Sequence, residues 1–178
     1  MITNVFRKFL NALYTTAGGT SGGNRTTLIQ GKTLAGQTRY VTPFSSSSFP
    51  DQVTNSLVLG TSGYGIVLGT GTTAPTGDDY NLAEQITSGI SATITTSTEI
   101  NASDEYVTTY NIVVTNSGSD PVTITEIGRT GGLASASTSG GTYSTAAFLF
   151  DRTLLDAPVE IAASGNATIK YTLKADLS

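Results

Sequence analysis

The sequence contains no cysteine, no histidine and no tryptophan, and only 12% of its 178 residues are charged. Without cysteine and histidine, the chain has no Ser-His-Asp triad, no cysteine nucleophile, no zinc finger and no disulfide. The net charge of −4 comes without a basic tract for a phosphate backbone, and the apolar runs are too short for a membrane-spanning helix. We therefore expect no catalytic residues, no cofactor, no metal, and no nucleic-acid or membrane partner.

Hydroxyl residues and glycine are abundant instead, with 32 threonines, 19 serines and 20 glycines. Such a composition is typical of many short strands joined by tight turns. The length indicates about one domain with an attached arm, and the 38% of hydrophobic residues are enough for one modest core. We predict an all-β protein, an antiparallel β-sandwich of jelly-roll or immunoglobulin-like type, with a short N-terminal amphipathic helix and an extended arm.

The predicted helix lies at the start of the chain, with Asn4 as its N-cap. Its apolar residues follow the spacing i, i+3, i+4, i+7 and are Phe6, Phe9, Leu10 and Leu13. We do not expect a signal peptide, because Arg7 and Lys8 interrupt the apolar stretch and no cleavage site follows. A helix of about ten residues is marginal alone in water, so it needs its own domain or a neighbouring subunit to pack on.

The composition divides the chain into three parts. Residues 1–26 are the predicted helix and a glycine-rich linker, 27–56 are an extended or irregular segment, and 57–178 are the β-sandwich domain. The linker uncouples the helix from the domain, which favours an arm that docks on a neighbour over a helix folded onto its own sandwich. We therefore predict that the four apolar helix residues are assembly contacts.

Within 57–178, alternating apolar and polar residues predict most of the strands. The predicted elements are strands at 57–59 and 65–68, a short helix over 80–86 capped by Asp79, strands at 106–114 and 122–127 that pair around a turn at 116–121, a loop at 129–146, and strands at 159–161 and 167–173.

Two glycine motifs suggest nucleotide binding but lack the rest of the required pattern. Residues 31–33 (Gly-Lys-Thr) resemble the end of a phosphate-binding loop, yet Thr26 stands where that loop requires glycine. Residues 69–74 fit a dinucleotide fingerprint, but Pro75 follows where a helix should open. We interpret residues 69–77 as a structured surface loop.

The charged residues are sparse enough to be considered one by one. Four carboxylates offer oxygens for Ca²⁺ but lie in no calcium-loop frame, so we interpret them as caps and solvated turn charges: Asp78, Asp79, Asp104 and Glu105. Asp151 and Arg152 follow an apolar run and pair either internally or across a subunit. They join the helix residues as candidate assembly contacts.

Four stretches between residues 66 and 173 resemble stretches of a known group of proteins. They are residues 66–84 (IVLGTGTTAPTGDDYNLAE), 122–128 (VTITEIG), 149–159 (LFDRTLLDAPV) and 165–173 (GNATIKYTL). In this order they are similar to virion proteins of tailed bacteriophages, especially tail, collar and fibre-attachment domains. Those domains usually have leucine after the sequence Glu-Ile-Gly, where this chain has Arg129. The resemblance implies a non-enzymatic, β-rich building block that is present in many symmetric copies.

The expected function is therefore that of a multi-copy tail or neck component of a phage virion: a collar, adaptor or fibre-attachment protein. Its partners would be further copies of itself and the portal, tail, fibre or capsid proteins. One alternative is a capsid-surface head fibre or decoration protein. Another is a host-surface or glycan-binding module that acts through the loop at 129–146, although Tyr143 is the only aromatic residue there for stacking on a sugar.

Overall fold

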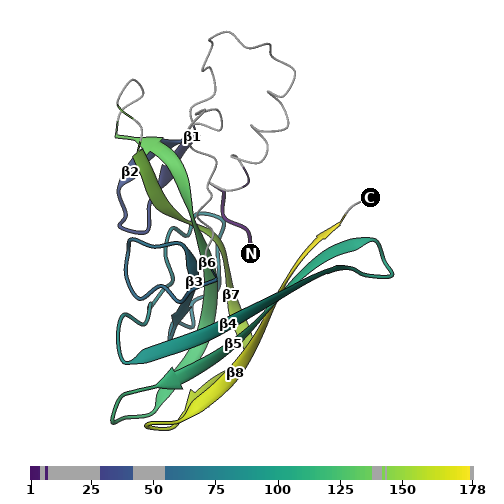
Figure 1. The fold of residues 1–178 in the computed structure, drawn as a ribbon. Coiled ribbons are helices and arrows are strands. Elements are labelled where there is room, and N and C mark those ends of the chain that lie inside the picture. Colours follow the sequence, from purple (N-terminus) through teal and green to yellow (C-terminus); the bar gives the residue numbers. More distant parts are fainter. Residues whose placement is uncertain (5–6, 8–28, 42–54, 138–141, 143, 177–178) are drawn as a thin grey trace.

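The computed structural model describes residues 1–4, 7, 29–41, 55–137, 142 and 144–176. Within these residues the chain forms eight strands (Figure 1), and helical backbone occurs only at Asn4 and Arg7. They are β1 (Ile29–Lys32), β2 (Thr38–Val41), β3 (Gly65–Gly69), β4 (Ile90–Ile100), β5 (Glu105–Asn116), β6 (Val122–Ala136), β7 (Ser144–Ile161) and β8 (Asn166–Asp176). The predicted all-β class is confirmed, whereas the predicted N-terminal helix lies mainly outside the described residues.

The larger of two antiparallel sheets is organised around β6. One edge of β6 pairs with β7 along most of its length, and the other edge pairs first with β3 and then with β2. Strand β1 completes this large sheet as the hairpin partner of β2. The smaller sheet has the order β4-β5-β8, and Figure 1 shows one end of the β4–β5 hairpin extending away from the large sheet.

The two sheets share one hydrophobic core. Its buried residues come from five strands of both sheets, and from Ile90 at the start of β4: Ile66, Leu68, Tyr110, Ile112, Val114, Ile124, Ile127, Ile161, Ile169 and Tyr171. A second core lies on the other face of the large sheet, where turns and loops cover it: Leu34, Val58, Val67, Leu82, Ala147 and Leu149. The alternation of Ile66, Val67 and Leu68 between the two cores follows from the two-residue period of a strand.

The ladder between β6 and β7 is irregular near Glu126, where one unpaired residue of β6 lies against four unpaired residues of β7. The register with β7 shifts between Ile124 and Glu126. Without a shift, Ile124 and Ile127 would point to opposite faces of the strand, because they are three residues apart. With the shift, both isoleucines join the core between the sheets, and Glu126 lies against residues 71–84 on the other face.

The predicted strand pairing was wrong, because composition does not reveal strand partners. The predicted pairing of 106–114 with 122–127 does not occur, since β5 and β6 belong to different sheets. The turn between them is held by buried Asn116, whose side-chain amide donates to the carbonyls of Asp120, Ile161 and Ala162 at 2.8, 3.2 and 3.2 Å. Asn116 therefore fastens the crossing between sheets to the end of β7.

The predicted loop at 129–146 was also wrong, because most of it belongs to β6 and β7. Its glycines leave room for aromatic side chains: a Cβ at Gly131 would collide with Phe150, and one at Gly132 would collide with Tyr64. Part of the segment 27–56, which was predicted as extended or irregular, forms the β1–β2 hairpin of the large sheet. The guanidinium of Arg39 ties this hairpin to Ser135 and Ser144 through three hydrogen bonds of 2.8 to 3.1 Å.

Candidate functional site

A buried ion cluster lies where the large sheet meets the loop of residues 70–84. Arg152 on β7 and Glu126 on β6 are 2% and 0% exposed. The Arg152 Nε donates to Glu126 Oε2 at 2.8 Å, and one terminal nitrogen donates to Asp79 Oδ2 at 2.6 Å. The other terminal nitrogen donates to the carbonyl of Thr73 at 2.7 Å. All three nitrogens of this guanidinium are therefore occupied within the chain.

The Glu126 carboxylate also organises the backbone of the loop. Its Oε1 accepts from the amides of Gly71 and Glu84 at 3.1 and 2.8 Å, and its Oε2 accepts from the amide of Ala83 at 3.1 Å. A buried carboxylate needs such donors, because an ion pair alone seldom offsets the loss of hydration. The loop is thus wrapped around one charged side chain of β6.

Two glycines make this close approach possible. A Cβ on Gly69 would lie 2.5 Å from Glu126 Oε1 and 2.6 Å from the Glu84 carbonyl oxygen. A Cβ on Gly71 would lie 2.5 Å from the same carboxylate oxygen and 2.6 Å from the Ala83 side chain. The glycine pattern that resembles a nucleotide fingerprint therefore serves to admit a glutamate from within the chain.

Asp79 fixes the middle of the loop. Its carboxylate accepts from the amide and hydroxyl of Thr76 at 2.9 and 2.8 Å, as well as from Arg152. Partial burial on its own raises the pKa of Asp79, but these hydrogen bonds outweigh it and hold the pKa below its ordinary value. For Arg152, burial favours a lower pKa, and the hydrogen bonds to Asp79 and Glu126 outweigh it and raise the pKa.

The short helix predicted over 80–86 is absent, and its absence has a local cause. The amides of Ala83 and Glu84 donate to Glu126, and the amide of Ile86 donates to the carbonyl of Leu68 on β3. The carboxylate of Asp79, which was predicted as the helix cap, accepts hydrogen bonds from Thr76 and Arg152 instead. Contacts with the sheet have replaced the hydrogen bonds that a helix would make.

The first residues of the chain lie beside the same part of β7. Ile2 forms an antiparallel bridge with Asp151, and the amide and hydroxyl of buried Thr3 donate to the carbonyls of Phe150 and Leu149 at 3.0 and 2.6 Å. Asn4, predicted as a helix cap, donates from its side-chain amide to Asp78 at 3.0 Å. The segment therefore joins the edge of β7 to the loop.

A second polar group lies between the two sheets. The Tyr171 hydroxyl on β8 donates to Asp151 Oδ1, and the guanidinium carbon of Arg129 lies 5.3 Å from the centre of the Tyr110 ring. Burial, followed by the charge and the hydrogen bond of Asp151, raises the pKa of Tyr171 strongly. Arg129, which departs from the expected leucine, thus contacts an aromatic ring of the small sheet.

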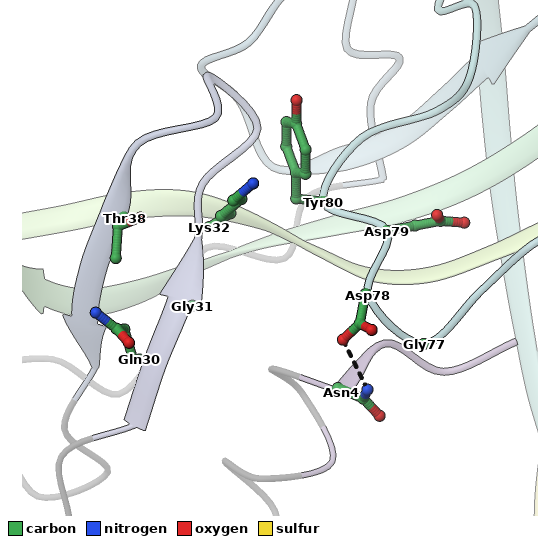
Figure 2. A pocket seen from close by; sticks show the side chains of 9 residues that line it. All are labelled: Asn4, Gln30, Gly31, Lys32, Thr38, Gly77, Asp78, Asp79 and Tyr80. Atoms are coloured by element: carbon green, nitrogen blue, oxygen red, sulfur yellow. Dashed lines mark hydrogen bonds between the residues drawn. The ribbon is translucent and has the colours of Figure 1, made fainter.

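A hollow of about 360 Å³ lies between the loop and the β1–β2 hairpin. Figure 2 shows Lys32 directed toward Tyr80, and Asp78 directed toward Asn4. The Lys32 ammonium lies 5.0 Å from the centre of the Tyr80 ring, a cation–π distance. Because these polar side chains contact one another, we interpret the hollow as a seam between loop and hairpin.

The candidate assembly residues have different outcomes. Asp151 and Arg152 are buried and pair internally, which is one of the two alternatives for them. Phe6, Phe9, Leu10 and Leu13 lie outside the described residues, so their role stays a prediction. In the described part of the chain, no group of acidic side chains is arranged to hold a metal ion, and no helix is long and apolar enough to cross a membrane.

A scan of protein-family models, a search of curated proteins and a search of solved structures each returned no match for this chain. Function is therefore inferred from its own residues.

Among the residues of the ion cluster, Glu126 was missed as a site residue, because a carboxylate in an alternating strand usually faces solvent. The available signal was its place in the stretch at 122–128, which occurs together with the stretches that hold Asp79 and Arg152.

Proposed function

We propose that this chain is a non-enzymatic structural protein of a tailed-bacteriophage virion, present in many copies as a tail or neck component. The carrying observation is that three of the four stretches behind the resemblance meet in one buried cluster. Residues 66–84 supply Gly71 and Asp79, residues 122–128 supply Glu126, and residues 149–159 supply Arg152. Motifs that are far apart in sequence therefore contribute to one structural cluster. This supports treating them as one combined resemblance rather than as separate matches.

The purpose of the cluster suits a building block. Its charged groups form hydrogen bonds within the chain, and these bonds fix the shape of a surface loop. A loop of fixed shape is a suitable surface for repeated contacts between subunits. The proposal includes a β-sandwich of jelly-roll or immunoglobulin-like type as the body of each subunit. Localisation would be the virion, and the partners would be further copies and the portal, tail, fibre or capsid proteins.

The start of the chain supports the arm in this proposal. Thr3 is bound to the edge of β7 and Asn4 to the loop, so the chain leaves the body from a defined position. The apolar residues of the predicted helix begin at Phe6, shortly after this attachment. A tether raises the local concentration of a docking segment, so a short helix can latch onto a neighbouring subunit.

The test is the composition of virus particles. Peptides of this chain should appear in nuclease-resistant particles that are purified by density gradient from a lysate of the strain encoding it. Labelling with a specific antibody in electron microscopy then separates the tail or neck from the capsid surface of the alternative proposal. Absence from gradient-purified particles, with the chain present in the lysate, would contradict the virion proposal.

The arm has its own test. The double change of Phe9 and Leu13 to aspartate should abolish incorporation into particles while leaving the melting temperature of the purified chain unchanged. The matched control is Asn11→Asp, which adds a charge on the predicted polar face and should be incorporated normally. A lower melting temperature of the double variant would instead show that the helix packs on its own domain.

A further inference from the structure

Strand β4 is an edge strand without the usual protection against pairing. Among the described residues, only β5 pairs with it, and that register runs unbroken over all eleven residues from Ile90 to Ile100. Natural edge strands are kept apart by lysine, proline, bulges or short length. Strand β4 (ISATITTSTEI) has no lysine, arginine or proline, and Glu99 is its only charge.

The opposite edge of the same sheet is protected. Strand β8 carries Lys170 and Lys174, and both are exposed. Lysines on an edge disfavour the approach of another strand, because their charges would lose water on pairing. The contrast between the two edges therefore points to β4 as the side of the small sheet that accepts a partner.

Hydrogen bonds at both ends of β4 show which backbone groups are directed to the free edge. The amide of Ser117 donates to the Gly89 carbonyl at 2.9 Å, and the amide of Asn101 donates to the Glu105 carbonyl at 3.0 Å. In an antiparallel ladder, hydrogen-bonded pairs alternate with non-hydrogen-bonded pairs. The odd-numbered residues of β4 therefore bond to β5, and the even-numbered residues direct their amides and carbonyls outward.

We propose that β4 pairs antiparallel with β4 of a second copy of the chain across a two-fold axis at Thr95, so that two small sheets become one six-stranded sheet. In this register Ile94 lies opposite Thr96 of the partner subunit, and Ala92 lies opposite Thr98 of the partner subunit. It is the one antiparallel self-pairing that uses all eleven residues, and it pairs outward-directed residues with each other. The proposal deepens the multi-copy function proposed above by naming a contact between subunits.

Charge and side-chain type suit a second copy as the partner. In the proposed register Glu99 lies opposite Ser91, and the two Glu99 residues are eight positions apart, about 26 Å. Most other pairs contain a threonine or isoleucine, whose branched side chains favour cross-strand packing. The only charge on the strand therefore never meets itself across the axis.

The uneven covering of the small sheet gives an independent reason for the same arrangement. At one end of β4, Ile90 is 4% exposed beneath the large sheet, whereas Ile100 and its pairing partner Tyr106 at the other end are 62% and 46% exposed. Figure 1 shows this end of the hairpin extending beyond the large sheet. A two-fold axis at Thr95 places the bare end of each copy beside the covered end of the other, where apolar contact is available.

A cysteine-free chain allows a direct test of the register. The full-length Thr95→Cys variant should form a disulfide-linked dimer under mild oxidation, since residue 95 lies opposite itself in a non-hydrogen-bonded pair with Cα atoms about 4.5 Å apart. The matched control is Thr93→Cys, which is exposed on the same face of the same strand. In the proposed register the two residues 93 are four positions apart, so this variant should stay uncrosslinked.

Charge substitution tests the same contact without a covalent bond. By analytical ultracentrifugation, the wild-type chain should associate, and Thr95→Lys and Thr95→Glu should each raise the dissociation constant at least about tenfold, because like charges meet at the axis. A one-to-one mixture of the two variants should regain association. The control Thr168→Lys, an exposed threonine on β8, should associate as the wild type does.

Two results would overturn the β4 contact: equal crosslinking of the two cysteine variants, or a loss of association by Thr168→Lys with none by Thr95→Lys. A wild-type chain that stays monomeric at all concentrations would overturn it as well. These failures are distinct from failure of the virion proposal. A monomer whose peptides occur in particles contradicts only the β4 contact, and a β4-linked dimer that is missing from particles contradicts only the virion proposal.

Discussion

The guanidinium of Arg152 and the carboxylate of Glu126 form a buried ion pair with an Nε–Oε2 distance of 2.8 Å. The two residues lie on neighbouring strands, β7 and β6, and they bind loop residues from both sides. Because each charge has several hydrogen-bond partners, the pair is compensated for its loss of hydration. Removing one charge leaves the other uncompensated, which gives the first prediction.

Glu126→Gln should lower the free energy of unfolding by about 3–5 kcal/mol, the typical result of breaking a buried ion pair. The change removes the charge opposite Arg152 and places an amide donor where backbone amides already donate. Urea denaturation followed by circular dichroism measures the effect. The matched control is Glu160→Gln, an exposed residue of β7, which should stay within about 0.5 kcal/mol of the wild type. Equal stability of both variants would show that the Glu126 charge has no structural importance.

Gly71→Ala should lower the free energy of unfolding by about 1–3 kcal/mol, the usual cost of overpacking. The new methyl group would lie 2.5 Å from Glu126 Oε1, so the carboxylate or the loop must move. The control is Gly60→Ala, because a Cβ at Gly60 meets nothing within 4 Å. Thermal denaturation of both variants compares them directly. An unchanged melting temperature for Gly71→Ala would mean that the loop tolerates displacement from Glu126.

Local patterns predicted strands well where one side of the strand is buried. The alternation of Ile112 and Val114 with Asn111 and Val113 predicted β5, and both Ile112 and Val114 are in the core. The assignment of strands to sheets was not accessible, because β5 and β6 have similar patterns and the buried Asn116 directs the chain from one sheet to the other. Composition also misled at Gly131, which reads as a loop residue but makes room for Phe150 inside the large sheet.

The ion cluster was likewise predictable from the sequence only in part. Arg152 was recognised as a pairing residue because it follows the apolar run that ends at Phe150. Its partner Glu126 could not be predicted, since the register with β7 shifts between Ile124 and Glu126 and the regular alternation of faces is interrupted there. Partners within the chain depend on such a register shift, and alternation along a single strand does not reveal it.

Acid should weaken the fold partly through Asp79. Since its pKa is lowered in the folded chain, its contribution is fully present above the unfolded aspartate pKa of about 4 and is lost as the pH falls through the lower folded pKa. The melting temperature of the wild type should therefore decrease as the pH drops below about 4. The melting temperature of Asp79→Asn should decrease less over the same pH range. The exposed Asp156→Asn is the control and should follow the wild type. Parallel curves for all three proteins would contradict the role of Asp79.

Alkali should weaken the fold through Tyr171. Its pKa is raised in the folded chain by burial and by Asp151, so its contribution is fully present below the unfolded tyrosine pKa of about 10 and is lost as the pH rises above it. Tyr171→Phe should therefore make the decline of stability above about pH 10 less steep. At neutral pH the same change should cost about 1–3 kcal/mol, because the buried carboxyl group of Asp151 loses a hydrogen-bond donor.

The alkaline prediction is measured by urea denaturation at pH 7 to 11, together with absorbance at 295 nm, which records tyrosine ionisation. In the folded wild type, Tyr171 should stay protonated while exposed tyrosines ionise, and it should ionise only as the chain unfolds. The control is Tyr106→Phe, which should keep the wild-type decline in stability because Tyr106 is 46% exposed. Ionisation of Tyr171 with the exposed tyrosines in a chain that stays folded would contradict the assignment, because its hydroxyl would then have to leave Asp151 without loss of structure.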